Sequence, residues 1–93
     1  MNRDSRVRRN PEVVGRDLAE NEGGVLLHLQ SGAYHGLNRV GLIVWQLLDE
    51  ERTVSELVDA VRARFDGAPP TVDDDVVAFL QSALERDLVQ LVE

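Results

Sequence analysis

The sequence predicts an α+β domain in which a small three-stranded antiparallel sheet is followed by three helices. Short apolar runs bounded by turn residues occupy the first part of the chain. Apolar residues at helical spacing occupy the rest, in stretches separated by polar or proline-containing breaks. A chain of 93 residues is long enough for one small domain but not for two. Because the three strands precede the three helices, we expect a sheet beside a helix cluster.

The strands are expected at residues 13–18, 25–29 and 34–37. The middle run is apolar and too short for a helix, and turn signals at residues 21–24 and 30–33 bound it. A two-residue turn at Ser31-Gly32 would join the second and third strands.

This turn sets the expected register of the hairpin. It pairs Leu29 with Tyr34, His28 with His35 and Leu27 with Gly36. Side chains alternate across a strand, so each face of the sheet collects every second residue. The residues expected to face the core are Val25, Leu27, Leu29 and Tyr34. The residues expected on the opposite face are Leu26, His28, His35 and Leu37.

The first two helices have clear start signals. Asn38 is a plausible N-cap for the first helix, in which Trp45 is expected to pack in the core. Thr53 and Glu56 match a capping box for the second helix. Its apolar stripe consists of Val54, Leu57, Val58, Val61 and Phe65. The proline-containing stretch 66–70 ends this helix.

The third helix carries the most informative pattern. Thr71 is its candidate N-cap, and aspartates at 73–75 suit the positive end of the helix dipole. Its apolar face is wider than one packing seam needs. Either one edge meets the core and the other lines an apolar groove, or the whole face is buried; the sequence leaves both open. Residues 89–92 could form a short closing strand.

Charge divides the chain unevenly. The net charge is −7, yet residues 1–9 carry four arginines against one aspartate. We expect residues 1–10 to be a flexible basic arm and residues 11–93 to form the folded domain. The acidic body should repel a phosphate backbone and attract cationic partners.

Composition argues against several kinds of chemistry. The chain has no cysteine, which rules out disulfides, thiolate zinc sites and cysteine nucleophiles. His28 and His35 lack the further ligands that a structural metal needs, so a plain surface pair is the expected reading. We expect no catalytic residue, no metal and no cofactor, and therefore no enzyme. The chain lacks a membrane-length apolar run and a leading signal-like stretch, which favours the cytoplasm.

Three segments in order carry a resemblance to a known family. They read VLLHLQSGAYHGLN at residues 25–38, GLIVWQLLD at 41–49 and TVSEL at 53–57. A strand, a Ser-Gly turn, a tyrosine, Leu-Asn and a helix with Trp-x-Leu-Leu resemble the PqqD-like family. Members are recognition domains in pathways that make and modify ribosomal peptides. Two residues depart from the family pattern: Asp87 stands where glycine is common, and His35 where a second aromatic is common.

The resemblance implies a winged helix-turn-helix-like domain that binds the leader of a precursor peptide. The leader would add as a strand to the edge of the third strand and lean on the third helix. The residues implied for the edge strand are Ala33, Tyr34, His35 and Gly36. Those implied for the helical wall are Asp75, Val76, Phe79, Leu80 and Ala83.

In its length, the chain most resembles the stand-alone recognition protein of lasso-peptide pathways. The implied partners are then a separate leader peptidase and a cyclase, with no nucleic acid or membrane. An exposed strand edge can also pair with its own copy, so a monomer or a weak dimer is expected. The alternative is an acidic winged-helix DNA-binding or regulatory protein. The sparse positive charge of the third helix disfavours it, because a helix that reads DNA should carry Arg or Lys.

Overall fold

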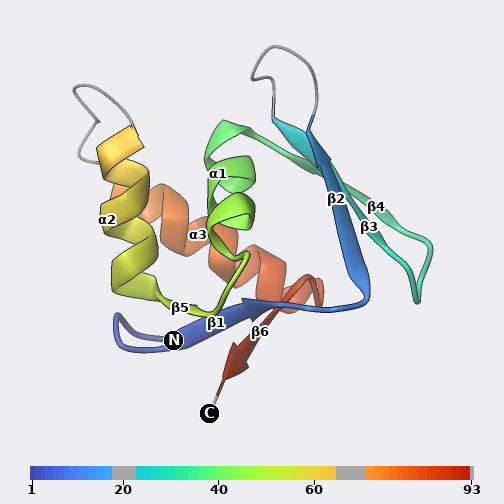
Figure 1. The fold of residues 1–93 in the computed structure, drawn as a ribbon, viewed down its shortest axis with the longest axis horizontal. Helices are drawn as coiled ribbons and strands as arrows, with labels where there is room; N and C mark the ends of the chain where they lie inside the picture. The colour runs from blue at the N-terminus through green and yellow to red at the C-terminus, as the bar shows by residue number, and fades with distance from the viewer. Residues whose placement is uncertain (18–22, 65–70, 93) are drawn as a thin grey trace.

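The computed structural model describes residues 1–17, 23–64 and 71–92 of the chain. Within these residues the fold is α+β, as predicted, with three helices and two small antiparallel sheets (Figure 1). The helices are α1 (Arg39–Leu47), α2 (Val54–Arg64) and α3 (Val72–Glu85). The strands are β1 (Arg6–Arg9), β2 (Val13–Asp17), β3 (Gly24–His28), β4 (Tyr34–Leu37), β5 (Arg52–Thr53) and β6 (Val89–Val92).

The two sheets cover two sides of one helix cluster. The predicted sheet has strand order β2-β3-β4 and lies at one side of α1. A second sheet, with order β5-β1-β6, lies below the helices in the view of Figure 1. It includes the closing strand suggested at residues 89–92. Both sheets and all three helices contribute to one apolar core, for example through Val7, Leu26, Val44, Leu57 and Leu80.

The prediction that residues 1–10 form a flexible arm is wrong for residues 6–9, which form β1. This strand is the centre of its sheet, paired with β5 on one side and β6 on the other. Strand alternation buries Val7 completely while Arg6 and Arg8 face solvent. The charges dominate the sequence there, but the single buried valine decides where the segment packs. The folded domain therefore includes β1.

Arg9 fastens the end of β1 to α1. Its guanidinium carbon lies 4.6 Å from the centroid of the Trp45 ring, within range of a cation–π interaction. Its Nε donates a 3.0 Å hydrogen bond to the Trp45 backbone oxygen. Burial lowers the pKa of Arg9, and the nearby Asp49 carboxylate acts in the opposite direction. Arg9, the last basic residue of the predicted arm, is thus a packing residue rather than part of a solvated tail.

The β3–β4 hairpin has a register two residues away from the predicted one. Tyr34 pairs with Leu27 instead of Leu29. Residues 29–33 lie between the two strands, and the Leu29 N–H donates on the β2 side, to the Glu12 backbone oxygen at 2.7 Å. The connection between the strands is therefore longer than the two-residue turn that the Ser-Gly pair suggested.

The faces of this sheet are reversed relative to the prediction. Leu26 is fully buried, and Leu37 and His28 are also buried. In contrast, Tyr34 is 72% exposed and Leu29 is 53% exposed. A register shift of two residues preserves the alternation of side chains, so the error lies in which face was assigned to the core.

Trp45 explains which face is buried. Its side chain is 5% exposed, as expected for a core residue, and packs against β2 at Gly15. A Cβ on Gly15 would lie 2.5 Å from Trp45 Nε1 and 3.0 Å from Leu26 Cδ2. The glycine admits the indole ring, and α1 therefore covers the face that carries Leu26.

Two of the three predicted helix caps form as expected. The Asn38 Oδ1 accepts a 2.8 Å hydrogen bond from the Gly41 N–H. In the capping box, the Glu56 N–H donates to Thr53 Oγ1 at 3.1 Å and the Thr53 N–H donates to Glu56 Oε1 at 3.0 Å. These bonds to Thr53 hold the pKa of Glu56 below its usual value. Thr71 occupies the N-cap position of α3, but its side chain makes no capping hydrogen bond.

The substitution Thr53→Ala should lower the free energy of unfolding by about 1 kcal/mol, because the Glu56 N–H loses its side-chain acceptor. Urea denaturation of the purified domain measures this change. Thr53→Ser keeps the hydroxyl and should cost less. Equal losses for the two variants would show that the hydroxyl does not stabilise α2.

At the end of α3, Asp87 adopts a backbone conformation that is usually found at glycine. Asp87 has a φ of +60°, in the left-handed region that Asp tolerates better than most residues. The Leu88 N–H donates to the Ala83 oxygen at 2.9 Å and the Asp87 N–H to the Leu84 oxygen at 3.2 Å. This pair of bonds is the Schellman motif. The aspartate therefore preserves the helix end despite the departure from glycine.

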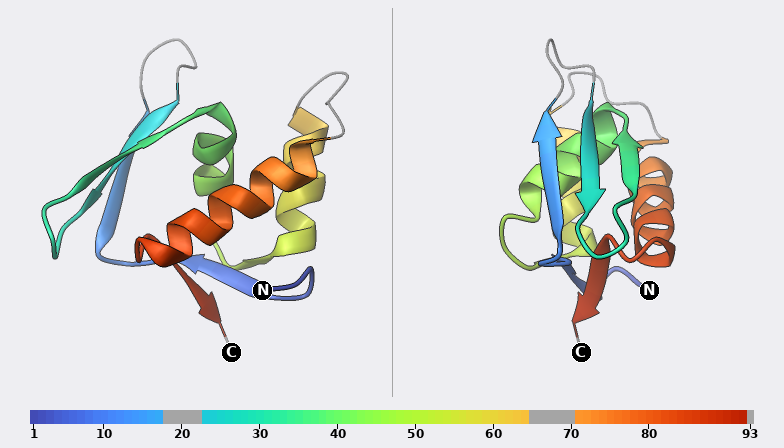
Figure 2. Two further views of the ribbon diagram at one scale, coloured as in Figure 1. Left: turned by 180° about the vertical axis from the view of Figure 1, so that it is seen from behind. Right: turned by 90° about the vertical axis from the view of Figure 1, so that its right-hand side faces the viewer.

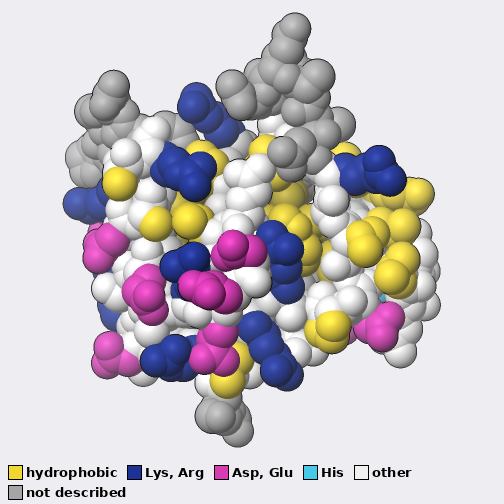
Figure 3. Space-filling model, in the orientation of Figure 1, with side chains coloured by type: hydrophobic (Ala, Val, Ile, Leu, Met, Phe, Trp, Pro, Cys, Tyr) yellow, Lys and Arg dark blue, Asp and Glu magenta, His cyan; other side chains and the backbone are white. Residues whose placement is uncertain are grey.

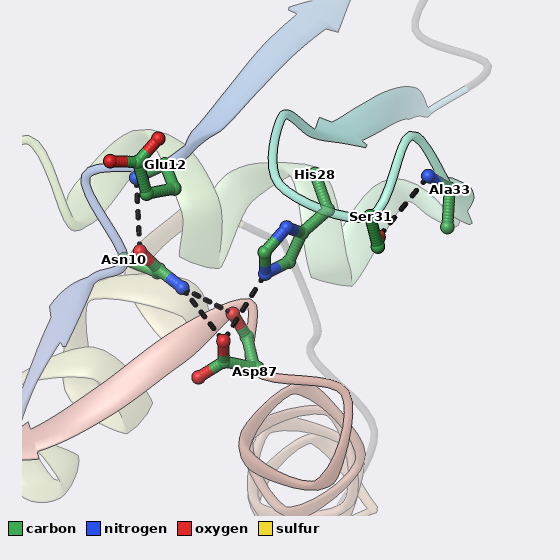
Figure 4. Close-up of polar contacts among 6 residues, drawn as sticks. All are labelled: Asn10, Glu12, His28, Ser31, Ala33 and Asp87. Carbon is green, nitrogen blue, oxygen red and sulfur yellow. Dashed lines mark hydrogen bonds and ion pairs between the residues drawn. The ribbon is translucent and has the colours of Figure 1, made fainter.

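Asp87 also ties α3 to the β2-β3-β4 sheet (Figure 4). His28 Nε2 lies 3.2 Å from its carboxylate, and Asn10 Nδ2 donates to its backbone oxygen at 2.7 Å. Both His28 and Asn10 are buried. The prediction of a surface pair between His28 and His35 is therefore wrong. His28 helps to hold the end of α3 against the sheet.

Some predictions fall outside the described residues. These concern residue 18 of the first strand, the turn at residues 21 and 22, Phe65 in the second helix and the break at residues 66–70. Among the residues described, no helix combines the length and the apolar character needed to cross a membrane.

Candidate functional site

β4 lies at an open edge of its sheet. Its hydrogen-bonded neighbour is β3, and none of the described strands pairs with its other side. Residues of an antiparallel pair alternate between those that exchange backbone hydrogen bonds and those that do not. Because the His28 N–H donates to the Ala33 oxygen at 2.9 Å, we expect Tyr34 and Gly36 to direct their N–H and C=O groups away from β3. The edge thus presents two donors and two acceptors.

A groove separates this edge from α3. Figure 2 shows β4 between β3 and α3, with the helix beside the open edge. The groove has a volume of about 390 Å³. It is lined by Gly36, Leu37 and Asn38 on one side and by Asp75, Ala78, Phe79 and Ser82 on the other.

The helical wall of the groove is one stripe of α3. Residues 75, 78, 79 and 82 follow the spacing that places side chains on one helix face. Phe79 is half-buried and is the large apolar side chain of this wall. It also packs near α1, since a Cβ on Gly41 would lie 3.0 Å from its ring. Small side chains at Ala78 and Ser82 leave room beside the ring.

The wide apolar face of α3 is therefore divided between two uses. The neighbouring stripe, formed by Val72, Val76, Leu80 and Ala83, is buried. Phe79 borders that stripe and faces the groove. Of the two alternatives that the sequence left open, a core edge plus a groove edge is the one observed.

The acidic residues at the start of α3 differ in their surroundings. Asp73 accepts a 2.6 Å hydrogen bond from Arg62 Nε and a 3.0 Å bond from Arg3 Nη2. These bonds, with that from Arg62 the stronger influence, hold the pKa of Asp73 below its usual value. Asp75 is exposed and lines the groove. Negative charge on the groove wall therefore comes from Asp75, whereas Asp73 is paired with arginines.

Of the residues predicted for the helical wall, Asp75 and Phe79 line the groove. Val76, Leu80 and Ala83 are at most 1% exposed. Their assignment to the wall is corrected: they are core residues on the adjacent stripe of the helix.

Of the residues predicted for the edge strand, Gly36 lines the groove. Ala33 and Tyr34 are exposed, and His35 is half-buried. Ala33 precedes β4 rather than belonging to it. Tyr34 lines a second depression, on the outer face of the sheet, instead of the groove.

Four groove residues were missed from the sequence: Leu37, Asn38, Ala78 and Ser82. Asn38 was identified as a helix cap, a role that does not reveal its position beside the groove. Ala78 and Ser82 lie three and seven residues after Asp75, and this helical spacing was the available signal. Their small side chains gave no reason to single them out.

Comparison with known proteins shows which family and which solved structures this chain resembles. The family model described as Coenzyme PQQ synthesis protein D (PqqD) matches residues 23–89. The structure of TbiB1 in complex with the TbiA(beta) leader peptide is similar, with 36% sequence identity and a TM-score of 0.74. That similarity covers 89% of this chain and 94% of that chain.

Two further structures share the fold. Lasso peptide synthetase B1 complexed with the leader peptide is 26% identical, with a TM-score of 0.68, and the similarity covers 90% of this chain and 96% of that chain. The PqqD truncation of Methylobacterium extorquens PqqCD, described as a stand-alone RiPP recognition element, is 20% identical, with a TM-score of 0.71 and coverage of 91% and 88%. A search of curated proteins gives no match.

Proposed function

This chain belongs to the PqqD family, and from that premise we propose that it binds the leader region of a ribosomally made precursor peptide by strand addition to β4. The observation that carries the proposal is the open β4 edge beside the groove of α3. The 36% identity to TbiB1, whose structure contains a leader peptide, supports the same conclusion.

The geometry suggests how affinity and selectivity are divided. An extended peptide beside β4 would bond to the N–H and C=O groups of Tyr34 and Gly36, which any sequence can do. Side chains that enter the groove would meet apolar Phe79 and negatively charged Asp75, which lie on the same α3 wall. Selectivity then depends on the side chains and affinity partly on the backbone.

We further propose that the protein acts by presentation rather than by chemistry. A bound leader holds the rest of the precursor near a leader peptidase and a cyclase, which raises their effective concentration. The similarity to lasso peptide synthetase B1 supports this pathway. Because the precursor is made on ribosomes, we place this step in the cytoplasm.

Calorimetric titration with synthetic leaders tests the proposal. The probes are the TbiA(beta) leader and the leader of any short precursor gene found beside the gene for this chain. We expect saturable one-to-one binding by at least one of them. N-methylation of single backbone amides in that peptide should weaken binding by about tenfold at alternate positions, where a donor to β4 is lost. Absence of binding by every probe, or equal effects at all positions, would contradict strand addition.

Asp75 should favour leaders that carry basic residues. The substitution Asp75→Asn should weaken such a leader by about two- to fivefold at low salt, the range of an exposed ion pair. Binding by the wild type should also weaken as salt rises, more steeply than binding by the variant. Asp59→Asn, at an exposed position on α2, is the matched control and should have no effect. A salt-independent Kd for the wild type would contradict this role.

A further inference from the structure

A peptide bound along β4 has two faces, and the groove serves one of them. His35 and Leu37 point toward the core side of the sheet, whereas Tyr34 and Gly36 point to the outer face. Directly opposed residues of neighbouring strands project to the same face. In an added strand, every second side chain would therefore lie on the outer face, beside Tyr34 or Gly36.

The outer face of the sheet is largely apolar, with Arg16 as its charged residue. One row across the three strands consists of Val14, Leu27 and Tyr34, and the next consists of Arg16, Val25 and Gly36. Val14 is 47% exposed and Tyr34 is 72% exposed. At the right-hand edge of Figure 3, where this sheet is seen from its side, several apolar side chains lie next to one another, with charged side chains beside them. A depression of about 370 Å³ lies there, lined by Val14, Arg16, Val25, Leu27 and Tyr34.

Gly36 leaves a gap at the edge of this surface. A Cβ at this position would meet no atom within 4 Å, and the residue does not have a positive φ. Neither a turn nor a close contact therefore requires glycine here. Its effect is to leave Val25, the next residue of the row, uncovered toward the open edge. Large side chains on a neighbouring strand are known to cover such glycines in sheets.

We propose that the outer face is a second recognition surface for the bound peptide, and that it takes a large apolar or aromatic side chain beside Gly36. This inference rests on the proposed function, since it needs a strand paired with β4. The side chain lies across Gly36 onto Val25, with Tyr34 as its flanking wall. The peptide is then selected on both faces at adjacent positions, one side chain entering the groove and the next covering Gly36.

A randomised library of twelve-residue peptides, displayed and selected on the immobilised wild type, tests this directly. We expect the enriched peptides to share a large apolar or aromatic residue next to the residue that enters the groove. The strongest peptide is then titrated by fluorescence anisotropy. Gly36→Leu should weaken it by about tenfold or more, because the new side chain occupies the gap. Ala63→Leu adds similar bulk at an exposed position of α2 and should leave the Kd within about twofold.

A double-mutant cycle identifies the contact. Replacing the large peptide residue by Ala should weaken binding to the wild type but not further weaken binding to Gly36→Leu. Tyr34→Ala, which removes the flanking wall without adding bulk, should weaken the parent peptide by about fivefold. Additive effects in the cycle, or an unchanged Kd for Gly36→Leu, would overturn the outer surface while leaving strand addition in place.

Two further outcomes would overturn the proposed function together with this inference. If no peptide is enriched on the wild type, the proposed function fails and the outer surface with it. If sedimentation shows a dimer that persists in saturating peptide and is lost in Gly36→Leu, the edge is occupied by a second copy, and strand addition and the outer surface both fail.

Discussion

Gly36→Pro should reduce leader affinity by at least about tenfold. Proline has no N–H to donate, and a peptide carbonyl left without a partner at the edge costs about 1–3 kcal/mol. The Gly36 N–H is expected to point away from β3, so the substitution removes no bond of the existing ladder. Proline on edge strands is also a known obstacle to strand pairing.

Gly36→Ala is the control for this variant. It keeps the N–H, and the space around Gly36 admits a Cβ. It should change affinity by less than about threefold, the size of a small surface effect. Calorimetric titration gives both Kd values, and circular dichroism verifies that each variant is folded. Equal affinity of the two variants would show that this N–H does not bond to the leader.

Phe79→Ala should weaken leader binding by more than about 1 kcal/mol, as expected for an aromatic anchor at an interface. Phe79 is the large apolar side chain of the groove wall, and its ring is half-buried before any peptide binds. The same partial burial predicts some loss of stability, which thermal unfolding measures separately.

Val77→Ala is the matched control for Phe79→Ala. Val77 is also partly buried against the core, but it does not line the groove. It should lose stability and keep its leader affinity. If Phe79→Ala unfolds the domain, Phe79→Leu retains apolar packing and still removes the ring. If every Phe79 variant that folds binds the leader with full affinity, the anchor lies elsewhere.

Local signals in the sequence predicted the helices well. The Asn38 cap and the Thr53–Glu56 box depend on residues three positions apart, so their hydrogen bonds could be predicted without the fold. The strand β1 was missed because its partners lie far along the chain: Arg6 pairs with Val92. No local pattern indicates such a pairing.

The sheet and the site show a second limit of prediction from the sequence. Apolar residues line both faces of β3, so alternation gave no way to choose the buried one, and Tyr34 was assigned to the core. On α3, periodicity identified an apolar face but could not show which residues of that face enter the core and which line the groove. The distinction between Leu80 in the core and Phe79 in the groove depends on where β4 lies relative to the helix.

The brevity of β4 limits how much of a precursor this domain can hold. The strand has four residues, and α1 begins two residues after it ends. At about 3.3 Å per residue, the paired stretch is roughly 13 Å long. The rest of a bound peptide would lie outside this paired stretch. Under the proposed function, an enzyme could therefore act on a distant part of the same peptide while the short segment beside β4 stays bound.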